Sequence, residues 1–253
     1  MMQKYVPENE NLTHYLFFTG KGGVGKTTTA SATAVQLADD GNQVMLVSTD
    51  PASNLQDVFE TELTNKPKSI KNVSGLYVAN FDPVVAANEY RESVIGPYRN
   101  VLPEAALKNM AEQLSGSCTV EIASFNEFSN FLTSPEIAKR FDYIIFDTAP
   151  TGHALRMLQL PSAWSDYLDK IDRGASCLGQ LAGMGEKKAT YAKAVETLNN
   201  PDLTTLMLVT RPQRASFIEA ARASRELADM GMKHQQVIVN GTLLTHNDEA
   251  SQA

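Results

Sequence analysis

The sequence predicts an α/β fold, in which a doubly wound, mostly parallel sheet is flanked by helices. Short apolar runs alternate with longer helix-like runs along the chain, the order that places helices between parallel strands. The first apolar run, Tyr15 to Phe18, leads into a glycine-rich turn, and a helix-like run, Thr27 to Leu37, follows it. We expect one domain over residues 1–253. Residues 1–13 are expected to form a disordered lead-in, because Met1 to Asn11 are mostly polar and lack a signal-peptide core.

The later elements repeat this alternation. The first helix is expected to end at Gly41, since glycine commonly terminates helices. Short apolar runs typical of buried parallel strands occupy residues 43–49, 76–81, 141–147, 203–210 and 236–240. Helices are expected in two insertions, at about 82–132 and 161–200, in the stretch up to residue 140, and from about 215 to 230. Pro97, Pro103 and Pro135 are expected to interrupt the helices before residue 140.

The composition limits the class of protein. Of 253 residues, 43% are hydrophobic and 20% are charged, which suits one sizeable globular core, and the net charge is −7. The acidic balance argues against a nucleic-acid partner. No apolar stretch approaches the length of a membrane span. Cys118 and Cys177 lie far apart without a C-x-x-C pair, so we expect a cytoplasmic protein rather than a disulfide scaffold.

The glycine-rich turn has the form of a phosphate-binding loop. Gly20, four further residues and then Gly25-Lys26-Thr27 satisfy G-x-x-x-x-G-K-S/T between a strand and a helix. Glycine lets the backbone adopt unusual φ angles and approach a polyphosphate closely. We expect Lys26 to contact the β- and γ-phosphates of ATP and Thr27 to bind Mg²⁺. The expected nucleotide-binding residues of the loop are Gly20, Lys21, Gly22, Gly23, Val24, Gly25, Lys26, Thr27 and Thr28.

Polar residues at the ends of other strands extend this site, because function in open α/β sheets gathers at the carboxyl ends of the strands. Asp50 follows strand 43–49 and could orient the attacking water, or could cap the next helix. Asp147 ends strand 141–147 and is expected to hold Mg²⁺ opposite Thr27. Asn240 is suited to read the adenine edge. Arg211 and Pro212, after strand 203–210, are assigned to the same nucleotide site.

Two further segments carry candidate chemistry. Thr148 to His153 is a glycine-containing loop after Asp147, which is expected to act as a switch ordered by the γ-phosphate. Cys118 is expected near a helix N-terminus, because Gly116 and Ser117 are poor helix-interior residues. That position would lower the pKa of the thiol. From the residues alone, a buried structural cysteine is the preferred interpretation.

Lys21, directly after Gly20, gives GKGGVGKTT, which resembles the deviant Walker A motif of one superfamily of phosphate-binding-loop ATPases. The segments VSTDPASNL, FDTAPTGHALRML and VIVNG resemble the ArsA/Get family of that superfamily, over about Leu16 to Asn240. DTAPTGH discriminates this family best. The resemblance implies that Lys21 crosses a nucleotide-sandwich dimer to the phosphates of the partner, where a solvated loop lysine is the alternative. Lys21, Lys26 and Asp50 are the expected catalytic residues.

SGSCTVEIASFNEF and SCLGQLAGM resemble the cysteine-bearing segments of the arsenite/antimonite pump branch. That resemblance implies that Cys118, Cys177 and His153 bind As(III) or Sb(III) and thereby stimulate ATP hydrolysis, although His153 could instead be a partly buried structural histidine. Trivalent arsenic prefers soft thiolate ligands. The implied partners are a membrane arsenite permease, which would hold the protein peripherally at the inner face of the membrane, and an arsenite metallochaperone.

The sequence departs from this pattern in two ways. Pump ATPases of this branch usually contain two such halves, so a second half or a homodimer partner is needed to complete the metalloid site. The half normally continues beyond Asn240 with another helix and strand, so we expect a truncated C-terminus. The main alternative is a tail-anchored membrane-protein targeting ATPase of the same fold. A nucleotide-switched partitioning protein would need a basic surface or an amphipathic terminal helix, and neither is evident.

Overall fold

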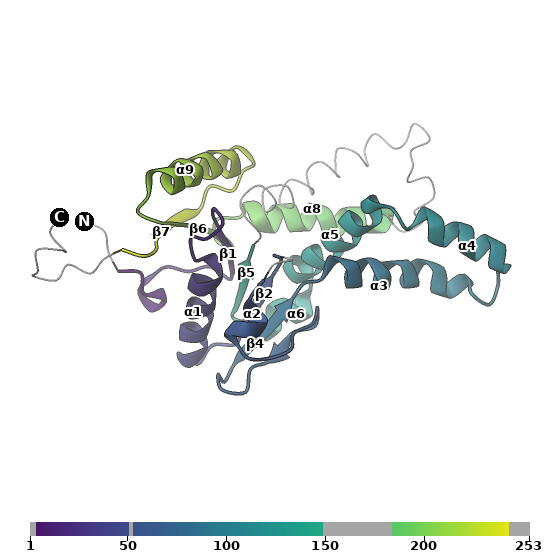
Figure 1. Cartoon of the computed structure of the whole chain (residues 1–253), viewed down its shortest axis with the longest axis horizontal. Helices are drawn as coiled ribbons and strands as arrows, with labels where there is room; N and C mark the ends of the chain where they lie inside the picture. Colours follow the sequence, from purple (N-terminus) through teal and green to yellow (C-terminus); the bar gives the residue numbers. More distant parts are fainter. Residues whose placement is uncertain (1–3, 51–52, 149–183, 243–253) are drawn as a thin grey trace, which may run out of the picture.

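A seven-stranded sheet forms the centre of the computed structural model, which describes residues 4–50, 53–148 and 184–242 (Figure 1). The strand order is β3-β4-β2-β5-β1-β6-β7. Every pair is parallel except β3 with β4. The strands are β1 (Tyr15–Thr19), β2 (Val44–Ser48), β3 (Lys68–Ser69), β4 (Leu76–Asn80), β5 (Tyr143–Asp147), β6 (Thr204–Thr210) and β7 (Gln235–Val239). The predicted doubly wound α/β fold is confirmed.

Helices cover both faces of the sheet, because alternate residues of each central strand are apolar on both sides. Leu16 and Phe18 of β1 pack with α1 (Lys26–Asp39) and α2 (Leu55–Val58) on one face. Phe17 packs on the opposite face with α5 (Ser117–Thr133), α8 (Met184–Asn199) and α9 (Arg214–Asp229), where α6 (Pro135–Arg140) also contributes. The phosphate-binding loop therefore begins at the end of β1, a strand that is buried on both faces.

Two helices and their connection extend from the sheet as an arm (Figure 1). The arm consists of α3 (Pro83–Ile95), η2 (Gly96–Tyr98), α4 (Glu104–Gln113) and the start of α5, as predicted for a helical insertion in this region. Asp82 caps α3 by accepting hydrogen bonds from the backbone N–H groups of Val84 and Val85. Pro83 follows at the first turn, where its missing N–H costs nothing.

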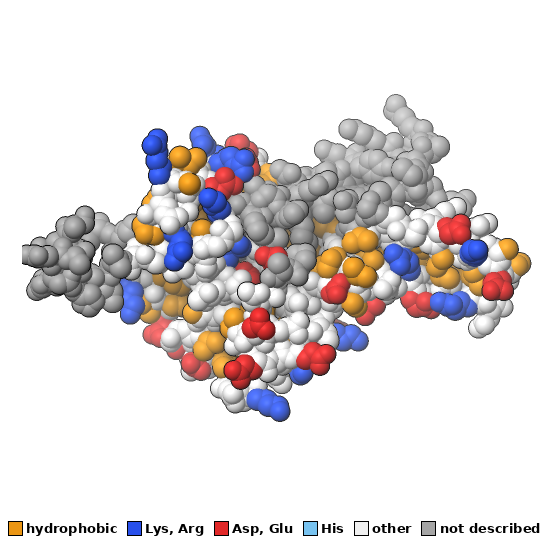
Figure 2. Space-filling view, in the orientation of Figure 1, with side chains coloured by type: hydrophobic (Ala, Val, Ile, Leu, Met, Phe, Trp, Pro, Cys, Tyr) orange, Lys and Arg blue, Asp and Glu red, His pale blue; other side chains and the backbone are white. Residues whose placement is uncertain are grey.

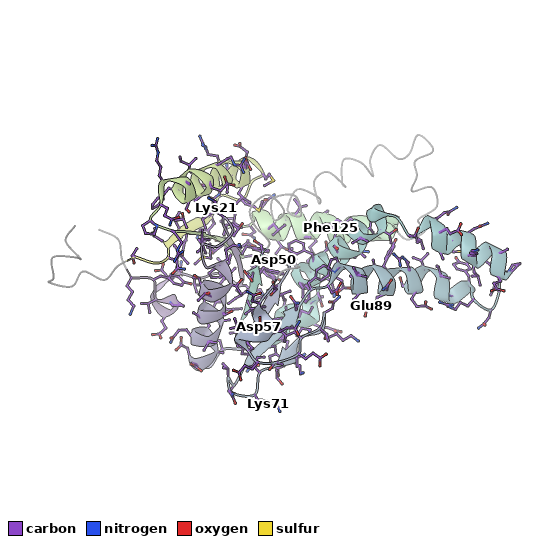
Figure 3. The ribbon with its side chains drawn as sticks, in the orientation of Figure 1. Lys21, Asp50, Asp57, Lys71, Glu89 and Phe125 are labelled. Carbon is purple, nitrogen blue, oxygen red and sulfur yellow. The ribbon has the colours of Figure 1, made fainter. Side chains whose placement is uncertain are left out.

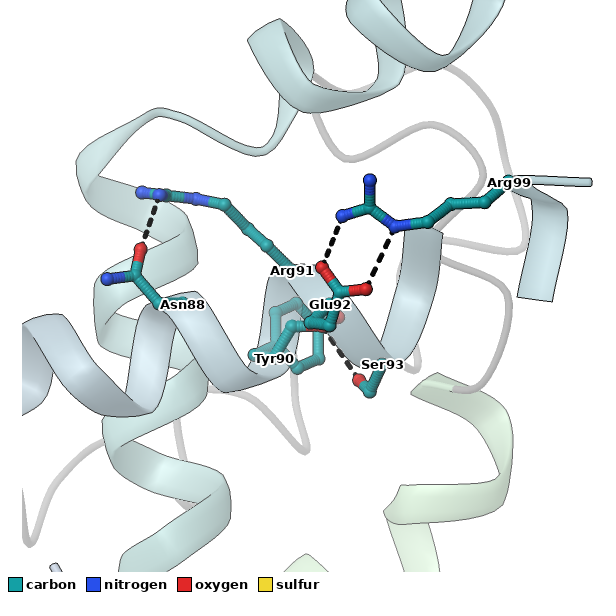
Figure 4. A network of polar contacts seen from close by, with 6 residues as sticks. All are labelled: Asn88, Tyr90, Arg91, Glu92, Ser93 and Arg99. Atoms are coloured by element: carbon teal, nitrogen blue, oxygen red, sulfur yellow. Dashed lines mark hydrogen bonds and ion pairs between the residues drawn. The ribbon is translucent and has the colours of Figure 1, made fainter. Parts of the chain in front are cut away.

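Polar contacts near the outer part of the arm are exposed (Figure 4). Arg99 binds Glu92 through two hydrogen bonds of 3.0 and 2.5 Å, and Arg91 donates to Asn88. The Arg99 and Glu92 side chains are 58% and 60% exposed, so this pair adds little to stability. On the face shown in Figure 2, Lys and Arg side chains lie over α9, and apolar side chains gather along the arm.

Some expected boundaries differ from the structure. A disordered lead-in over residues 1–13 is wrong from residue 4 onward. Pro7–Asn9 form a short 3-10 helix, and Tyr5 and Glu8 form hydrogen bonds with Thr33 and Gln36 of α1. The short strand β3 was not predicted, because it is too short to show a hydrophobic period. The helix expected after Asp50 is the single turn α2, and its N-cap is Asn54, so the alternative in which Asp50 caps this helix is wrong. Of the expected insertion at 161–200, only the part from Met184 is described. No helix in the described ranges is long and apolar enough to cross a membrane.

Candidate nucleotide site

The loop between β1 and α1 needs glycine at two positions where other elements approach it closely. A Cβ at Gly20 would lie 2.2 Å from the carbonyl oxygen of Val209, which is backbone and cannot move aside. A Cβ at Gly25 would lie 2.3 Å from the amide nitrogen of Asn240, and Gly25 has a φ of +91°. Both contacts are far too short for a Cβ, so β6 and the residue after β7 fix the path of the loop.

Thr27 and Asp147 meet at the carboxyl end of the sheet. The Thr27 hydroxyl donates a hydrogen bond of 2.8 Å to Oδ2 of Asp147. Strand register brings Asp147 there, because it lies beside Phe18 of β1 and beside Ser48 of β2. Its other oxygen, Oδ1, is buried and has no hydrogen-bond partner among the described residues.

Burial controls the charge of Asp147. The side chain is fully buried, and this raises the pKa of its carboxyl group to about 6, although the Thr27 hydrogen bond and the Lys26 charge act in the opposite direction. An unpartnered buried carboxylate oxygen next to a hydroxyl is a suitable pair of ligands for Mg²⁺, which takes few protein ligands and keeps waters and phosphate oxygens. The residues present therefore fit the expected cation.

Lys26 completes a buried cluster of charges. Its side chain is only 7% exposed, and burial lowers the pKa of its ammonium group, while the carboxylates of Asp147 and Asp50 counteract this shift.

The backbone N–H of Asp50 donates to the hydroxyl of Ser48, 3.2 Å away. Ser48 was not predicted as a site residue, although its place at the end of β2 between two candidate aspartates was a usable signal. Lys21 is exposed near the same end of the sheet (Figure 3).

Asn240 contacts the phosphate-binding loop directly, and Arg211 lies near the residue that follows Asn240. The amide nitrogen of Asn240 donates to the carbonyl oxygen of Val24 across 2.9 Å. Arg211 lies beside Gly241, where a Cβ would be 3.3 Å from the guanidinium. The structure thus gives Asn240 a role in supporting the loop that sequence reasoning missed. Its expected contact with adenine stays a prediction, as does the assignment of the exposed Pro212.

Comparison with known proteins places this site in a family. The family model described as "Anion-transporting ATPase" matches residues 13–253. The chain belongs to this family. Within it, the chain is 50% identical over 234 residues to an arsenical pump-driving ATPase of Escherichia coli, and 49% identical over the same length to one of Acidiphilium multivorum. It is also 34% identical to the ATPase GET3 of Kluyveromyces lactis, covering 94% of this chain and 74% of that protein.

The chain spans about 40% of the length of these two arsenical pump-driving relatives. It therefore corresponds to less than half of each of these two relatives.

Part of the site expected from the resemblance to the arsenite/antimonite pump branch, together with the expected switch loop, lies outside the described residues. This applies to Cys177, to His153 and to the loop after Thr148. Cys118 is the second residue of α5, which confirms its predicted place near a helix N-terminus. Within the described ranges, no three His, Cys, Asp or Glu side chains come together as a metal-ligand group.

Proposed function

We propose that this chain is an ATP-hydrolysing half of an arsenite/antimonite pump ATPase, and that As(III) or Sb(III) stimulates its hydrolysis. The observation that carries the ATPase part is the buried cluster in which Thr27 contacts Asp147 beside Lys26 at the end of a phosphate-binding loop. The arsenical part is supported by identities of about 50% to proteins named for driving an arsenical pump.

The geometry supports a division of roles among the residues of the loop. Backbone N–H groups of residues 20–28 and the N-terminus of α1 face bound phosphates, and Lys26 offsets their charge from a buried position. Mg²⁺ held by Thr27 and Asp147 would supply positive charge at the β- and γ-phosphate oxygens. Asp50 orients the attacking water, and its negative charge already acts on Lys26 and Asp147 in this structure.

Lys21 acts in trans. Its exposure leaves the ammonium group able to reach a partner, and a cation supplied across a closed dimer stabilises charge that develops on the phosphoryl oxygens. The partner is a second half of the same type or a second copy of this chain. The match of this chain to about 40% of the length of longer relatives supports that arrangement.

The metalloid ligands proposed here are Cys118, Cys177 and His153. Thiolates favour soft trivalent arsenic and antimony over hard anions. Cys118 lies in the first turn of α5. A membrane arsenite permease and an arsenite metallochaperone are the proposed partners, and the permease would hold the protein peripherally at the inner face of the membrane.

A targeting ATPase for tail-anchored membrane proteins is the second candidate. The helical arm favours it, because Val84 and Val101 of the arm are 61% and 75% exposed and could contact an apolar segment of a client. The lower identity to ATPase GET3 makes it the weaker candidate.

Calorimetric titration and ATPase assays with Sb(III) separate the two candidates. We expect the purified protein to bind Sb(III), to hydrolyse ATP faster in its presence, and to lose both responses in the variant Cys118→Ser/Cys177→Ser. Ser115→Ala, which alters an exposed hydroxyl just before α5, is the control and should respond normally. Binding that persists in the double variant, or a rate unaffected by Sb(III), contradicts the metalloid role. Release of a bound apolar client helix by ATP would then support the targeting function.

A further inference from the structure

Helix α5 contacts the strand that carries Asp147. The rings of Phe128 and Phe131 lie 5.4 and 6.3 Å from the ring of Phe146, which is the residue before Asp147. Phe17 of the neighbouring strand stacks on Phe146 at 4.4 Å with its plane almost parallel. All four rings are at most 5% exposed, so they form a close-packed group that transmits a displacement rather than absorbing it.

Phe146 and Asp147 face opposite sides of the sheet. The ring of Phe146 belongs to the core under α5, whereas the carboxylate of Asp147 contacts Thr27 of α1. Strand β5 is paired on both sides, with β1 and β2, so its end moves with its neighbours as a unit. A change in the position of α5 therefore reaches the proposed magnesium ligand through one peptide unit.

Tyr191 fixes α5 against α8. Its ring lies 4.6 Å from that of Phe125, and its hydroxyl donates to Oδ1 of Asn126. Tyr191 is 2% exposed, and burial raises the pKa of its phenol to about 12, so the hydroxyl keeps its proton at neutral pH. A directional hydrogen bond inside an apolar interface allows one relative position of two helices and penalises others.

Cys118 lies in the first turn of the same helix, about 10 residues before Phe128. We propose that Tyr191 is a positioning residue for stimulated hydrolysis, because it holds α5 in the position in which capture of a thiophilic ion at Cys118 is transmitted through Phe128 to Phe146 and Asp147. This proposal rests on the proposed function. The Tyr191 hydroxyl touches neither nucleotide nor metalloid, and acts through the position of α5 alone.

Substitution of the hydroxyl tests the proposal. In Tyr191→Phe the ring contact with Phe125 remains but the hydrogen bond is lost. We expect basal kcat and the KM for MgATP to stay within about twofold of the wild type, and the stimulation ratio (the rate with Sb(III) over the rate without it) to fall about fivefold. Tyr98→Phe, which alters a tyrosine 42% exposed on the arm, should keep the wild-type ratio.

A double-mutant cycle identifies the partner of the hydroxyl. Asn126→Ala should lower the stimulation ratio by a similar factor, and combining it with Tyr191→Phe should cause no further loss, since both remove the same contact. Should Tyr191→Phe fail to fold, Phe125→Leu serves instead, because it removes the ring contact and should lower the ratio at unchanged basal kcat.

The outcomes separate two failures. If wild-type protein is stimulated by Sb(III) and Tyr191→Phe is stimulated equally, the inference is wrong while the proposed function stands. If Tyr191→Phe lowers basal and stimulated rates in proportion, Tyr191 has only a structural role, and the inference is again overturned. If the wild type shows no stimulation at all, both the proposed function and the inference fail.

Discussion

The Thr27 hydroxyl lies 2.8 Å from the Asp147 carboxylate, although 120 residues separate the two in the sequence. This contact joins the first turn of α1 to the end of β5, and it leaves the second carboxylate oxygen buried without a partner in the described part of the chain. A buried carboxylate without a partner lowers the stability of the folded apo protein at neutral pH. A bound cation would offset this cost.

Substitution of Gly20 should destabilise the protein. A Cβ there would overlap the Val209 carbonyl oxygen, so we expect Gly20→Ala to lower the free energy of unfolding by about 2–4 kcal/mol. Gly22→Ala is the control. No atom lies within 4 Å of a Cβ at Gly22, and a change within about 0.5 kcal/mol is expected. Urea denaturation without nucleotide measures both, and equal stabilities for the two variants would contradict the observed path of the loop.

Asp147 should make the apo protein less stable as the pH rises. Its pKa in the folded state is about 6, against an ordinary value of 3.8, so folding favours the protonated form. The resulting stability is fully present below pH 3.8 and is lost as the pH rises through about 6. In Asp147→Asn, the decrease in the free energy of unfolding between low and neutral pH should be smaller by up to about 3 kcal/mol.

Urea denaturation in EDTA at pH 5 and pH 7.5 tests the effect of Asp147. We expect the stability difference between the two pH values to be smaller in Asp147→Asn than in the wild type. Excess Mg²⁺ at pH 7.5 should stabilise the wild type only. Identical pH dependence in the two proteins would show that Asp147 is ionised in the folded apo state without cost.

Asn240 should support nucleotide affinity through the loop. Asn240→Ala removes the hydrogen bond to Val24, and we expect the Kd for a fluorescent ATP analogue to rise about fivefold. Asn240→Asp should weaken binding further, because a carboxylate would face the Val24 carbonyl oxygen. Asn88→Ala, at an exposed position on α3, should bind normally. Tighter binding by Asn240→Asp than by Asn240→Ala would contradict the role of the Asn240 amide in stabilising the loop.

Lys21 should matter for turnover and little for binding. We expect Lys21→Ala to reduce Sb(III)-stimulated hydrolysis by about a thousandfold, while the Kd for ATP changes only a few-fold. Lys71→Ala, at an exposed lysine far from the loop (Figure 3), is the control and should keep full activity. Steady-state hydrolysis and equilibrium binding measure the two effects separately. A proportional loss of both in Lys21→Ala would assign the lysine to binding within its own subunit.

Asp50 should be needed for the chemical step. In Asp50→Asn we expect hydrolysis to fall by about 10²–10⁴-fold and an ATP-bound dimer to accumulate, because nucleotide still closes the site but water is no longer oriented. Light scattering with ATP detects the dimer. Asp57→Asn on α2 removes an exposed carboxylate that follows the same strand (Figure 3) and should hydrolyse ATP normally. Unchanged turnover in Asp50→Asn would remove Asp50 from the mechanism.

Elements with a clear hydrophobic pattern in the sequence were predictable. Elements that form only through contact with other strands or helices were not. Strands β1, β2, β5 and β6 lie close to their predicted positions, because each buried parallel strand contains a continuous apolar run that is visible in the sequence. The two-residue strand β3 exists only because β4 offers it an edge. The Asn240 contact with Val24 was missed for the same reason, since it joins residues 216 positions apart in the sequence.

The sequence by itself determined the α/β alternation, the phosphate-binding loop, the aspartate that ends β5 and the aspartate that follows β2, because each is encoded by neighbouring residues. Only the tertiary structure decided that Asp147 meets Thr27 with one oxygen unpartnered, that Gly25 faces Asn240, and that α5 rests on Phe146. These features arise from strand order and helix packing. The free energy of such contacts depends on which surfaces meet, and local sequence does not specify that.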